Sequence, residues 1–402
     1  MKKQLFRFTR IALAAGTFGA SSIALAAGNE IVIGQSVALT GSLAEVGKDY
    51  SAAMKAYFDY VNAKGGINGK QLKLVVKDDA STPAKTFQNA QALINENVDL
   101  LAGFTGTPNV SLLVRTKTLQ KNNIALVGPL TGADSLRKHY GEEEQKADQG
   151  NYQLGADTMT EGYIPQLFHV RAGYADEAQK IVKQAVSLGM SKIGVLYSDD
   201  AFGKTGLAAI TAALKAQKLQ LTAKGIYTVK TGDVSDAVKN IANAQPQAVI
   251  LLANTTPAAA FIKQYRQLDP GAQLFTLSTV TAPNLVKAIG VQGMAHGVGI
   301  SQVMPMPTNS LTPLSKEHQK VMAEYGKGTP ISYLTMEGHV VAKVIAEAVR
   351  RGGNNRASMF TGLEALKGYD AGGYFINFGP NERRASKYVD VTVIGANGEL
   401  MR

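Results

Sequence analysis

The chain of 402 residues contains no cysteine, no tryptophan and only five histidines. The absence of cysteine excludes disulfide bonds, thiol nucleophiles and thiolate metal sites. The histidines are scattered, at positions 139, 169, 296, 318 and 339, without the spacing of metal ligands. The sequence therefore predicts no metal site, and its stability has to come from core packing.

Motifs of hydrolases and nucleotide-binding enzymes are also missing. There is no G-x-S-x-G elbow, and no G-x-G-x-x-G follows the first strand. The stretch "SDDAFGKT" (198–205) ends like a phosphate-binding loop. However, Ser198 stands where such a loop needs glycine, and two adjacent acids would repel phosphate. We therefore expect no catalytic residues and no cofactor.

The first 26 residues have the features of a secretory signal peptide. Four cations and no acid precede a short apolar run, and Ala24-Leu25-Ala26 fits a small-x-small cleavage site. The alternative, a membrane anchor, is disfavoured because the run is short and interrupted by Gly, Thr and Ser. We expect cleavage after about Ala26 and an exported mature protein.

The positive charge of the remaining chain is spread out. Removing the four leader cations lowers the formal net charge from +11 to +7. No cluster of Lys and Arg with interleaved aromatics occurs, so nucleic acid is not an expected partner.

Short β-type runs alternate with amphipathic helical runs, which predicts parallel α/β sheets. The strands are expected at 30–39, 71–79, 98–104, 124–128, 168–172, 192–200, 247–254, 273–278 and 296–305. The helices are expected at 48–66, 82–97, 108–122, 176–189, 204–217 and 256–268. These are too many strands for one sheet, so we predict two α/β lobes.

The C-terminal part has a different pattern. Helices are expected at 315–326, 332–351 and 356–367, followed by β-type runs at 372–380 and 387–401 that we interpret as an antiparallel hairpin or sheet edge. Segment 138–167 has weak periodicity and an acidic triplet, and is interpreted as an insertion between the lobes.

The stretch "LAGFTGTPNVSLLV" (101–114) places hydrogen-bond donors between a strand and a helix. Thr107 before Pro108 is predicted to cap the helix. Free amides and the dipole at such a helix start suit a small anion, and the hydroxyls of Thr105 and Thr107 add donors. Gly106 allows close approach of a ligand. The simpler interpretation, that Thr107 only caps its helix, carries about equal weight.

Similar polar loops follow other strands. Thr131 and Gly132 lie in "GPLTGADSL", and "ALTGSLAEVG" follows the first strand. In the other half, "DDAFG" (199–203) and "NTTP" (254–257) follow strands. Ligands of open α/β sheets bind beyond the carboxyl ends of the strands, so two polar-edged lobes predict a cleft.

Several segments resemble the periplasmic substrate-binding proteins of ABC importers, in the group of the leucine/isoleucine/valine-binding proteins. They include "IGQSVALTGSLAEVGKDYSAAMKAYFDYVNAKGGINGKQLKLVVKDDASTP", "HVRAGYADE", "YSDDAFGKTGL" and "TMEGHVVAKVIAEAVRRGG". The resemblance implies two α/β lobes joined by three crossings. We expect lobe 1 at 27–137 and 306–368, and lobe 2 at 168–305 and 369–402.

The resemblance also implies binding residues. The loop that binds a ligand carboxylate corresponds to Thr105, Gly106 and Thr107, and the next loop to Leu130, Thr131 and Gly132. In the second lobe, Phe202 and Thr255 match contact positions, and Tyr174 is interpreted as lining the cleft or as packing.

One family feature is missing. The family's acid that pairs with a ligand ammonium falls near Ser278 or Thr279, and neither is acidic. A buried ammonium needs a charge partner, so Glu337 or Asp200 would have to replace it.

The leading hypothesis is a monomeric periplasmic receptor that captures a small polar solute by hinge closure and delivers it to an inner-membrane ABC permease. The solute would be a branched-chain or aromatic amino acid, or a related carboxylate or amide. The alternative is a ligand sensor of the same fold that signals to a partner protein. An exported enzyme is a third possibility, which the missing motifs disfavour.

Overall fold

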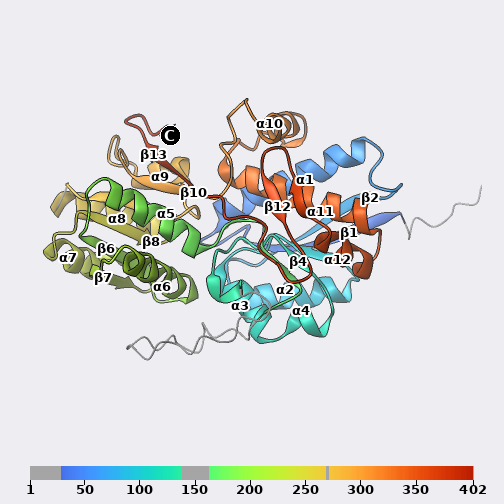
Figure 1. Cartoon of the computed structure of the whole chain (residues 1–402), viewed down its shortest axis with the longest axis horizontal. Helices are drawn as coiled ribbons and strands as arrows, with labels where there is room; N and C mark the ends of the chain where they lie inside the picture. Colours follow the sequence, from blue (N-terminus) through green and yellow to red (C-terminus); the bar gives the residue numbers. More distant parts are fainter. Residues whose placement is uncertain (1–28, 138–162, 269–270, 402) are drawn as a thin grey trace, which may run out of the picture.

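A computed structural model describes residues 29–137, 163–268 and 271–401 and consists of two α/β lobes side by side (Figure 1). The first lobe contains the N-terminal strands, and the second lobe is the green and yellow part at the left. Each lobe has a mostly parallel sheet between helical layers, which confirms the fold class expected from the alternating pattern.

The sheet of the first lobe has the order β2-β1-β3-β4-β5, and all of its strands are parallel. Its strands are β1 (Glu30–Val37), β2 (Gln71–Asp78), β3 (Leu100–Ala102), β4 (Leu126–Val127) and β5 (Leu167–Phe168). β3 and β4 are buried along their whole length, as expected for central strands covered on both faces.

Two long helices form the centre of the first lobe's core. α1 (Ala44–Ala63) buries Ala53, Tyr57 and Val61, spaced four residues apart, against α11 (Tyr333–Gly352). Ser332 caps α11 by accepting a hydrogen bond from the Thr335 amide at 3.2 Å. The other helices of this lobe are α2 (Pro83–Asn95), α3 (Thr107–Arg115), α4 (Thr118–Lys121), η1 (Asp134–Leu136), α10 (Pro313–Tyr325) and α12 (Arg356–Glu364).

The sheet of the second lobe has the order β14-β13-β10-β9-β8-β6-β7. Its strands are β6 (Ile193–Ser198), β7 (Leu221–Tyr227), β8 (Ala248–Leu252), β9 (Gln273–Thr276), β10 (Gly299–Gln302), β13 (Asp390–Ile394) and β14 (Leu400–Met401). Its helices are α5 (Tyr174–Ser187), α6 (Ala201–Ala216), α7 (Ser235–Asn243), α8 (Thr255–Leu268) and α9 (Ala282–Ile289). β13 is antiparallel to both of its neighbours, β10 and β14. The strand direction therefore changes at this edge of the sheet, which is formed by the C-terminal part of the chain.

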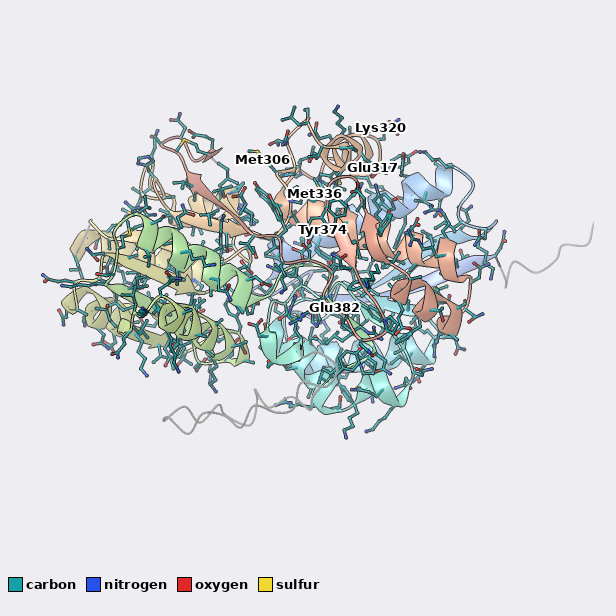
Figure 2. The ribbon with its side chains drawn as sticks, viewed as in Figure 1. Met306, Glu317, Lys320, Met336, Tyr374 and Glu382 are labelled. Atoms are coloured by element: carbon teal, nitrogen blue, oxygen red, sulfur yellow. The ribbon has the colours of Figure 1, made fainter. Side chains whose placement is uncertain are left out.

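The chain passes between the lobes after β5, after β10 and before β13. Tyr374, labelled in Figure 2, ties the first two passages together, because its hydroxyl donates to the carbonyl oxygens of Val170 (3.0 Å) and Val303 (3.4 Å). The third passage pairs with the first, since the His169 amide donates to the Arg383 carbonyl at 2.7 Å. The crossings thus form one compact hinge.

Two expected elements are interrupted. The helix predicted over 108–122 is two helices, because Lys117 adopts a left-handed backbone conformation (φ 54°) between α3 and α4. The helix predicted over 356–367 ends at Glu364, because β11 (Lys367–Asp370) pairs with β12 (Phe375–Asn377) through a turn containing Gly372 and Gly373.

The two last β-type runs do not form a hairpin with each other, but the alternative, an antiparallel sheet edge, is confirmed for the run 387–401. β12 pairs with β11, whereas β13 pairs with β10 and β14. The predicted lobe boundaries also need correction. β5 belongs to the first lobe's sheet, and Tyr374, Ile376 and Phe378 pack into the core formed by α1 and α11. Residues 369–388 therefore lie with the first lobe, and only β13 and β14 return to the second.

Most of the insertion expected at 138–167, and all of the signal peptide expected at 1–26, lie outside the described residues. Across the described ranges, none of the helices combines the length and apolar character needed to cross a bilayer.

Candidate functional site

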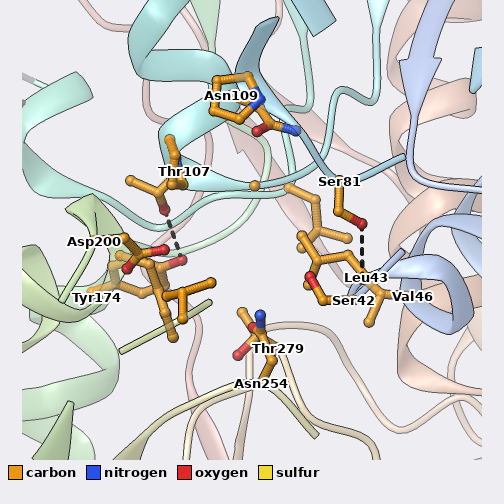
Figure 3. Close-up of a pocket in the computed structure, with 16 residues that line it drawn as sticks. Ser42, Leu43, Val46, Ser81, Thr107, Asn109, Tyr174, Asp200, Asn254 and Thr279 are labelled. Atoms are coloured by element: carbon orange, nitrogen blue, oxygen red, sulfur yellow. Dashed lines mark hydrogen bonds between the residues drawn. The ribbon is translucent and has the colours of Figure 1, made fainter. Parts of the chain in front are cut away.

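A cavity of about 260 Å³ lies between the lobes (Figure 3). The first lobe contributes Ser42, Leu43, Val46, Ser81, Pro83, Gly106, Thr107, Pro108, Asn109 and Leu130. The second lobe contributes Tyr174, Asp200, Phe202, Val229, Asn254 and Thr279. Most of these residues follow the carboxyl end of a parallel strand, which is where open α/β sheets bind ligands. The cleft predicted from the polar loops therefore exists as a cavity with walls from both lobes.

Five of the residues expected to contact a ligand line this cavity. They are Gly106, Thr107, Leu130, Tyr174 and Phe202. Tyr174 and Phe202 pack edge to face, with ring centroids 5.4 Å apart, and form one wall of the second lobe. Their contact gives the cavity an aromatic side.

Three other expected residues lie beneath the cavity wall of the first lobe. The Thr105 hydroxyl accepts a hydrogen bond from the Ala38 amide at 3.1 Å. The Thr131 hydroxyl lies 2.7 Å from that of Thr107. Gly132 accepts a hydrogen bond from the Tyr174 amide through its carbonyl at 2.7 Å, and a Cβ atom at this position would come within 2.4 Å of the Tyr174 ring. These residues support wall residues instead of lining the cavity.

In the second lobe, the cavity is lined by the neighbours of two expected residues. Asn254 and Thr279 line it, whereas Thr255 begins α8 and Ser278 contacts Arg171. Thr255 is half-buried at the start of the helix, and Ser278 lies in the turn after β9 with its side chain buried against Arg171, so in both cases the adjacent residue lines the cavity.

Helix α3 begins one residue earlier than predicted. Gly106, with φ 94°, occupies the cap position, and Thr107 is the first helical residue. The Thr107 side chain makes no capping hydrogen bond, and its hydroxyl lies 2.7 Å from that of Thr131 and 3.3 Å from that of Tyr174. The amides of the first turn of α3 consequently remain directed toward the cavity end of the helix.

Two buried polar atoms on residues of the cavity lining have no hydrogen-bond partner among the described residues. They are Nδ2 of Asn109, on α3, and Oγ1 of Thr279, in the loop after β9. Asn109 is 2% exposed and Thr279 is 7% exposed. An unpaired buried polar group costs free energy, so each lobe holds beside the cavity a polar group that would gain stability from a new hydrogen bond.

Among the described residues that line the cavity, Asp200 is the one acid, and none is Lys, Arg or His. Its Oδ1 accepts hydrogen bonds from the Ser198 hydroxyl (2.6 Å) and the Gly203 amide (3.1 Å), which caps α6. Within the described residues, Oδ2 makes no hydrogen bond of its own. Asp200 therefore caps α6 with Oδ1 and leaves Oδ2 available to a ligand.

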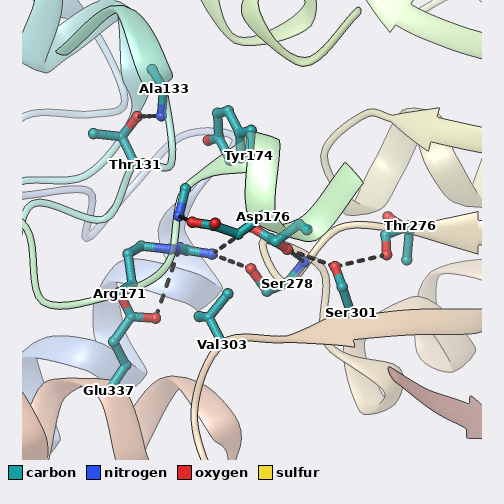
Figure 4. A network of polar contacts seen from close by, with 12 residues as sticks. Thr131, Ala133, Arg171, Tyr174, Asp176, Thr276, Ser278, Ser301, Val303 and Glu337 are labelled. Carbon is teal, nitrogen blue, oxygen red and sulfur yellow. Dashed lines mark hydrogen bonds and ion pairs between the residues drawn. The ribbon is translucent and has the colours of Figure 1, made fainter. Parts of the chain in front are cut away.

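The other acid considered from the sequence lies elsewhere. Glu337 is buried beside Arg171, with its Oε2 3.8 Å from Nη1 (Figure 4). Burial raises the pKa of Glu337, and the charge of Arg171 opposes that rise. Glu337 is committed to this buried pair and does not line the cavity.

Sequence reasoning did not assign several lining residues, among them Leu43, Ser81, Asn109 and Val229. Their position in the sequence could have indicated them, because each lies shortly after the end of a parallel strand or at the start of the helix that follows. The part of the chain that the structure describes contains no cluster of His, Asp and Glu able to hold a metal ion.

The chain is similar to known binding proteins along nearly its whole length. The model of the periplasmic binding protein family matches residues 30–399. Leu/Ile/Val-binding protein homolog 7 of Brucella suis biovar 1 (strain 1330) is 25% identical over 401 residues, covering 95% of this chain and 92% of that protein.

Solved structures show the same similarity. A substrate-binding periplasmic protein from Ralstonia solanacearum is 34% identical with a TM-score of 0.81, covering 92% of this chain and 99% of that one. A possible leucine/isoleucine/valine-binding protein from Rhodopirellula baltica SH 1 is 28% identical with a TM-score of 0.82, covering 93% and 96%.

Proposed function

Because the chain belongs to the periplasmic binding protein family, in its Leu/Ile/Val-binding group, we propose that it is the solute receptor of an ABC importer. It is a binding protein and not an enzyme. As a monomer in the periplasm, freed of residues 1–26, it captures a small polar solute and delivers it to an inner-membrane permease. The observation that carries this proposal is the cavity between the lobes, in whose lining Asn109 and Thr279 each have a buried polar atom without a hydrogen-bond partner among the described residues.

The cavity supports a solute with an acceptor end. The start of α3 offers free amides and partial positive charge, and Asn109 adds an amide donor on the same helix. The described part of the lining has no cationic side chain, so a carboxylate would be held by the helix end and by neutral donors such as Thr107. An amide oxygen fits the same donors.

The second lobe supports a cationic end, because Oδ2 of Asp200 is available as the charge partner of an ammonium group. Leu43, Val46, Phe202 and Val229 provide an apolar wall for an aliphatic or aromatic side chain. This combination favours a branched-chain or aromatic amino acid, in keeping with the names of the Brucella and Rhodopirellula relatives.

Capture follows from differential affinity. A solute in this cavity touches both lobes only when they lie close together, so binding stabilises that arrangement. The permease would then distinguish the loaded receptor by its lobe arrangement.

The test is a thermal-shift screen on refolded, ligand-stripped protein with amino acids, small carboxylates, amides and aromatic acids. A ligand at a hundredfold excess over its dissociation constant adds about 2.7 kcal/mol to the free energy of unfolding. The control is Asn109→Ala, which should lose most of the shift for the same compound. If no compound in these classes shifts the transition, the proposal is wrong.

A further inference from the structure

A fully buried arginine lies where the chain first passes between the lobes. Arg171 follows β5 and precedes α5, and it is 0% exposed. Its Nη2 lies 3.3 Å from Oε1 of Glu177 on α5, and its Nη1 lies 3.8 Å from Oε2 of Glu337 on α11 (Figure 4). The two carboxylates come from different lobes, so one cation bridges the hinge.

The contacts of Arg171 with the second lobe are strong. Its Nη2 donates to the Ser278 hydroxyl as well as pairing with Glu177. Oε2 of Glu177 in turn accepts from the Ser278 amide (2.9 Å) and the Ser301 hydroxyl (2.6 Å). Thr279, which lines the ligand cavity, directly follows Ser278. This network therefore fixes the loop that carries a cavity-lining side chain.

The contact with the first lobe is different in kind. Glu337 reaches Arg171 only as an ion pair, without a hydrogen bond, and it is the one first-lobe side chain among the described residues that pairs with the guanidinium. Both side chains are buried, and within the described ranges no other ion pair joins Arg171 or Glu337 to the opposite lobe. A rotation of the lobes would separate them and require water to hydrate each charge.

We propose that Arg171 is a positioning residue for ligand capture, holding the Ser278–Thr279 wall in place and, through Glu337, holding the two lobes in the arrangement described here. Calling the consequence ligand capture rests on the proposed function, but the hinge contact itself does not. Removing the Arg171–Glu337 ion pair should therefore let the lobes separate, whereas removing an ion pair that only stabilises the fold should leave their separation unchanged.

The chain contains a matched ion pair of that ordinary kind. Arg383 Nη2 lies 2.6 Å from Oε1 of Glu364 at the end of α12, and Arg383 is 4% exposed. The centre of the Phe168 ring, in β5, lies 4.4 Å from the Arg383 guanidinium, so the side chains of this pair lie in the first lobe, although the Arg383 backbone belongs to the third passage. Glu364 is half-buried, and Glu364→Gln removes its charge contact without touching the Arg171 network.

The test measures lobe separation in ligand-free protein. Because the chain has no cysteine, Lys85→Cys and Lys230→Cys allow two nitroxide labels to be attached selectively. Both positions are exposed, and they lie near Pro83 and Val229, on opposite walls of the cavity. Double electron–electron resonance then gives the distribution of distances between the lobes.

Glu337→Gln in this labelled background should increase the population at longer distances, whereas Glu364→Gln should leave the distribution unchanged. An unchanged distribution for Glu337→Gln, or equal changes in both variants, would overturn the proposal. If circular dichroism shows that Glu337→Gln does not fold, Glu337→Asp takes its place and should give a smaller shift in the same direction. No ligand is used, so a failure here is distinguishable from a failure of the proposed function.

Discussion

The hydroxyl groups of Thr107 and Thr131 lie 2.7 Å apart, joining the first turn of α3 to the loop after β4. Both side chains are buried, but only Thr107 lines the inter-lobe cavity. Thr131 also accepts a hydrogen bond from the Ala133 amide at 3.2 Å. The two loops therefore present a single contact surface, in which Thr131 orients Thr107 toward the cavity.

Thr107→Ala should weaken binding of the compound that gives the largest thermal shift. The loss of one buried hydrogen bond, with Thr131 and Tyr174 left without their partner, corresponds to roughly 1–3 kcal/mol. Isothermal titration calorimetry should therefore show a dissociation constant raised about 5- to 150-fold. An unchanged constant would refute the assignment of Thr107.

Asp200→Asn should separate ligands by charge. Asparagine retains an oxygen to cap α6 and accept from Ser198, so the fold should be preserved. The lost charge–charge contact should weaken binding of an amino acid by about 1.5–3 kcal/mol. The corresponding 2-hydroxy acid, which lacks the ammonium group, serves as the control and should bind no more weakly than before. Equal losses for both compounds would rule out an ammonium at Asp200.

Thr279→Val should stabilise the ligand-free protein while weakening binding. The Thr279 hydroxyl is buried without a partner, so replacing it by a methyl group of similar shape removes a cost of about 1–3 kcal/mol. Thr276→Val is the matched control, because its buried hydroxyl donates to the Leu251 carbonyl and its loss should lower stability. Thermal denaturation without and with ligand measures both effects. A lower transition temperature for Thr279→Val would mean that the hydroxyl is already paired in the protein.

The sequence was sufficient for the architecture, because alternating strands and helices are long-range features of the pattern. α1, α11 and the buried strand β8 lie close to where their apolar residues predicted them. Local exceptions could not be read in this way. The apolar pattern continues through the break at Lys117, and β7 was missed because Ala, Lys and Gly, which are depleted in strands, occupy its middle. The β11–β12 pairing depends on a tertiary contact with the first lobe's core.

The site was predictable at the level of loops rather than side chains. Strand-end loops were correctly expected to face one another, and Gly106, Thr107, Leu130, Tyr174 and Phe202 line the resulting cavity. In the second lobe, Thr255 and Ser278 were expected to contact the ligand, but their neighbours Asn254 and Thr279 line the cavity. Which residue of a loop faces the cavity depends on the twist of strands that are far apart in the sequence. The sequence suggested Asp200 and Glu337 equally as the acid that pairs with a ligand ammonium. It could not exclude Glu337, because the burial of Glu337 beside Arg171 is a tertiary property.

Gly128→Ala should destabilise the first lobe. Gly128 has a φ of 61°, and a Cβ atom there would lie 2.3 Å from Cγ2 of Val341 on α11. The left-handed conformation costs about 1–2 kcal/mol for a residue with a side chain, and the overlap adds roughly 1–3 kcal/mol.

Gly232→Ala isolates the first of these costs, because Gly232 has a φ of 66° and no atom within 4 Å of its Cβ position. Thermal unfolding should show a larger loss of stability for Gly128→Ala than for Gly232→Ala. Equal losses would mean that α11 moves away from the new methyl group without cost.

The pH dependence of stability should contain a contribution from Asp134, which joins the lobes by accepting a hydrogen bond from the Ala175 amide at 3.0 Å. Burial raises the pKa of Asp134 from 3.8 to about 6. Between these values the folded protein holds a proton that the unfolded chain has lost, so the free energy of unfolding should fall as the pH rises through this window. Below it both states are protonated, and above it both are ionised, so the contribution is constant on either side.

Asp134→Asn removes this titration while keeping the size of the side chain. Other groups act in the opposite direction, since burial lowers the pKa of His318 to about 3 and stability from that group rises with pH between about 3 and 6.5. The informative quantity is therefore the difference between wild type and Asp134→Asn, measured by urea unfolding from pH 4 to pH 7. Relative to the variant, wild type should lose at most about 1.4 kcal/mol per pH unit up to about pH 6 and nothing further above it. Parallel curves across the whole range would show that Asp134 titrates alike in the folded and unfolded chains.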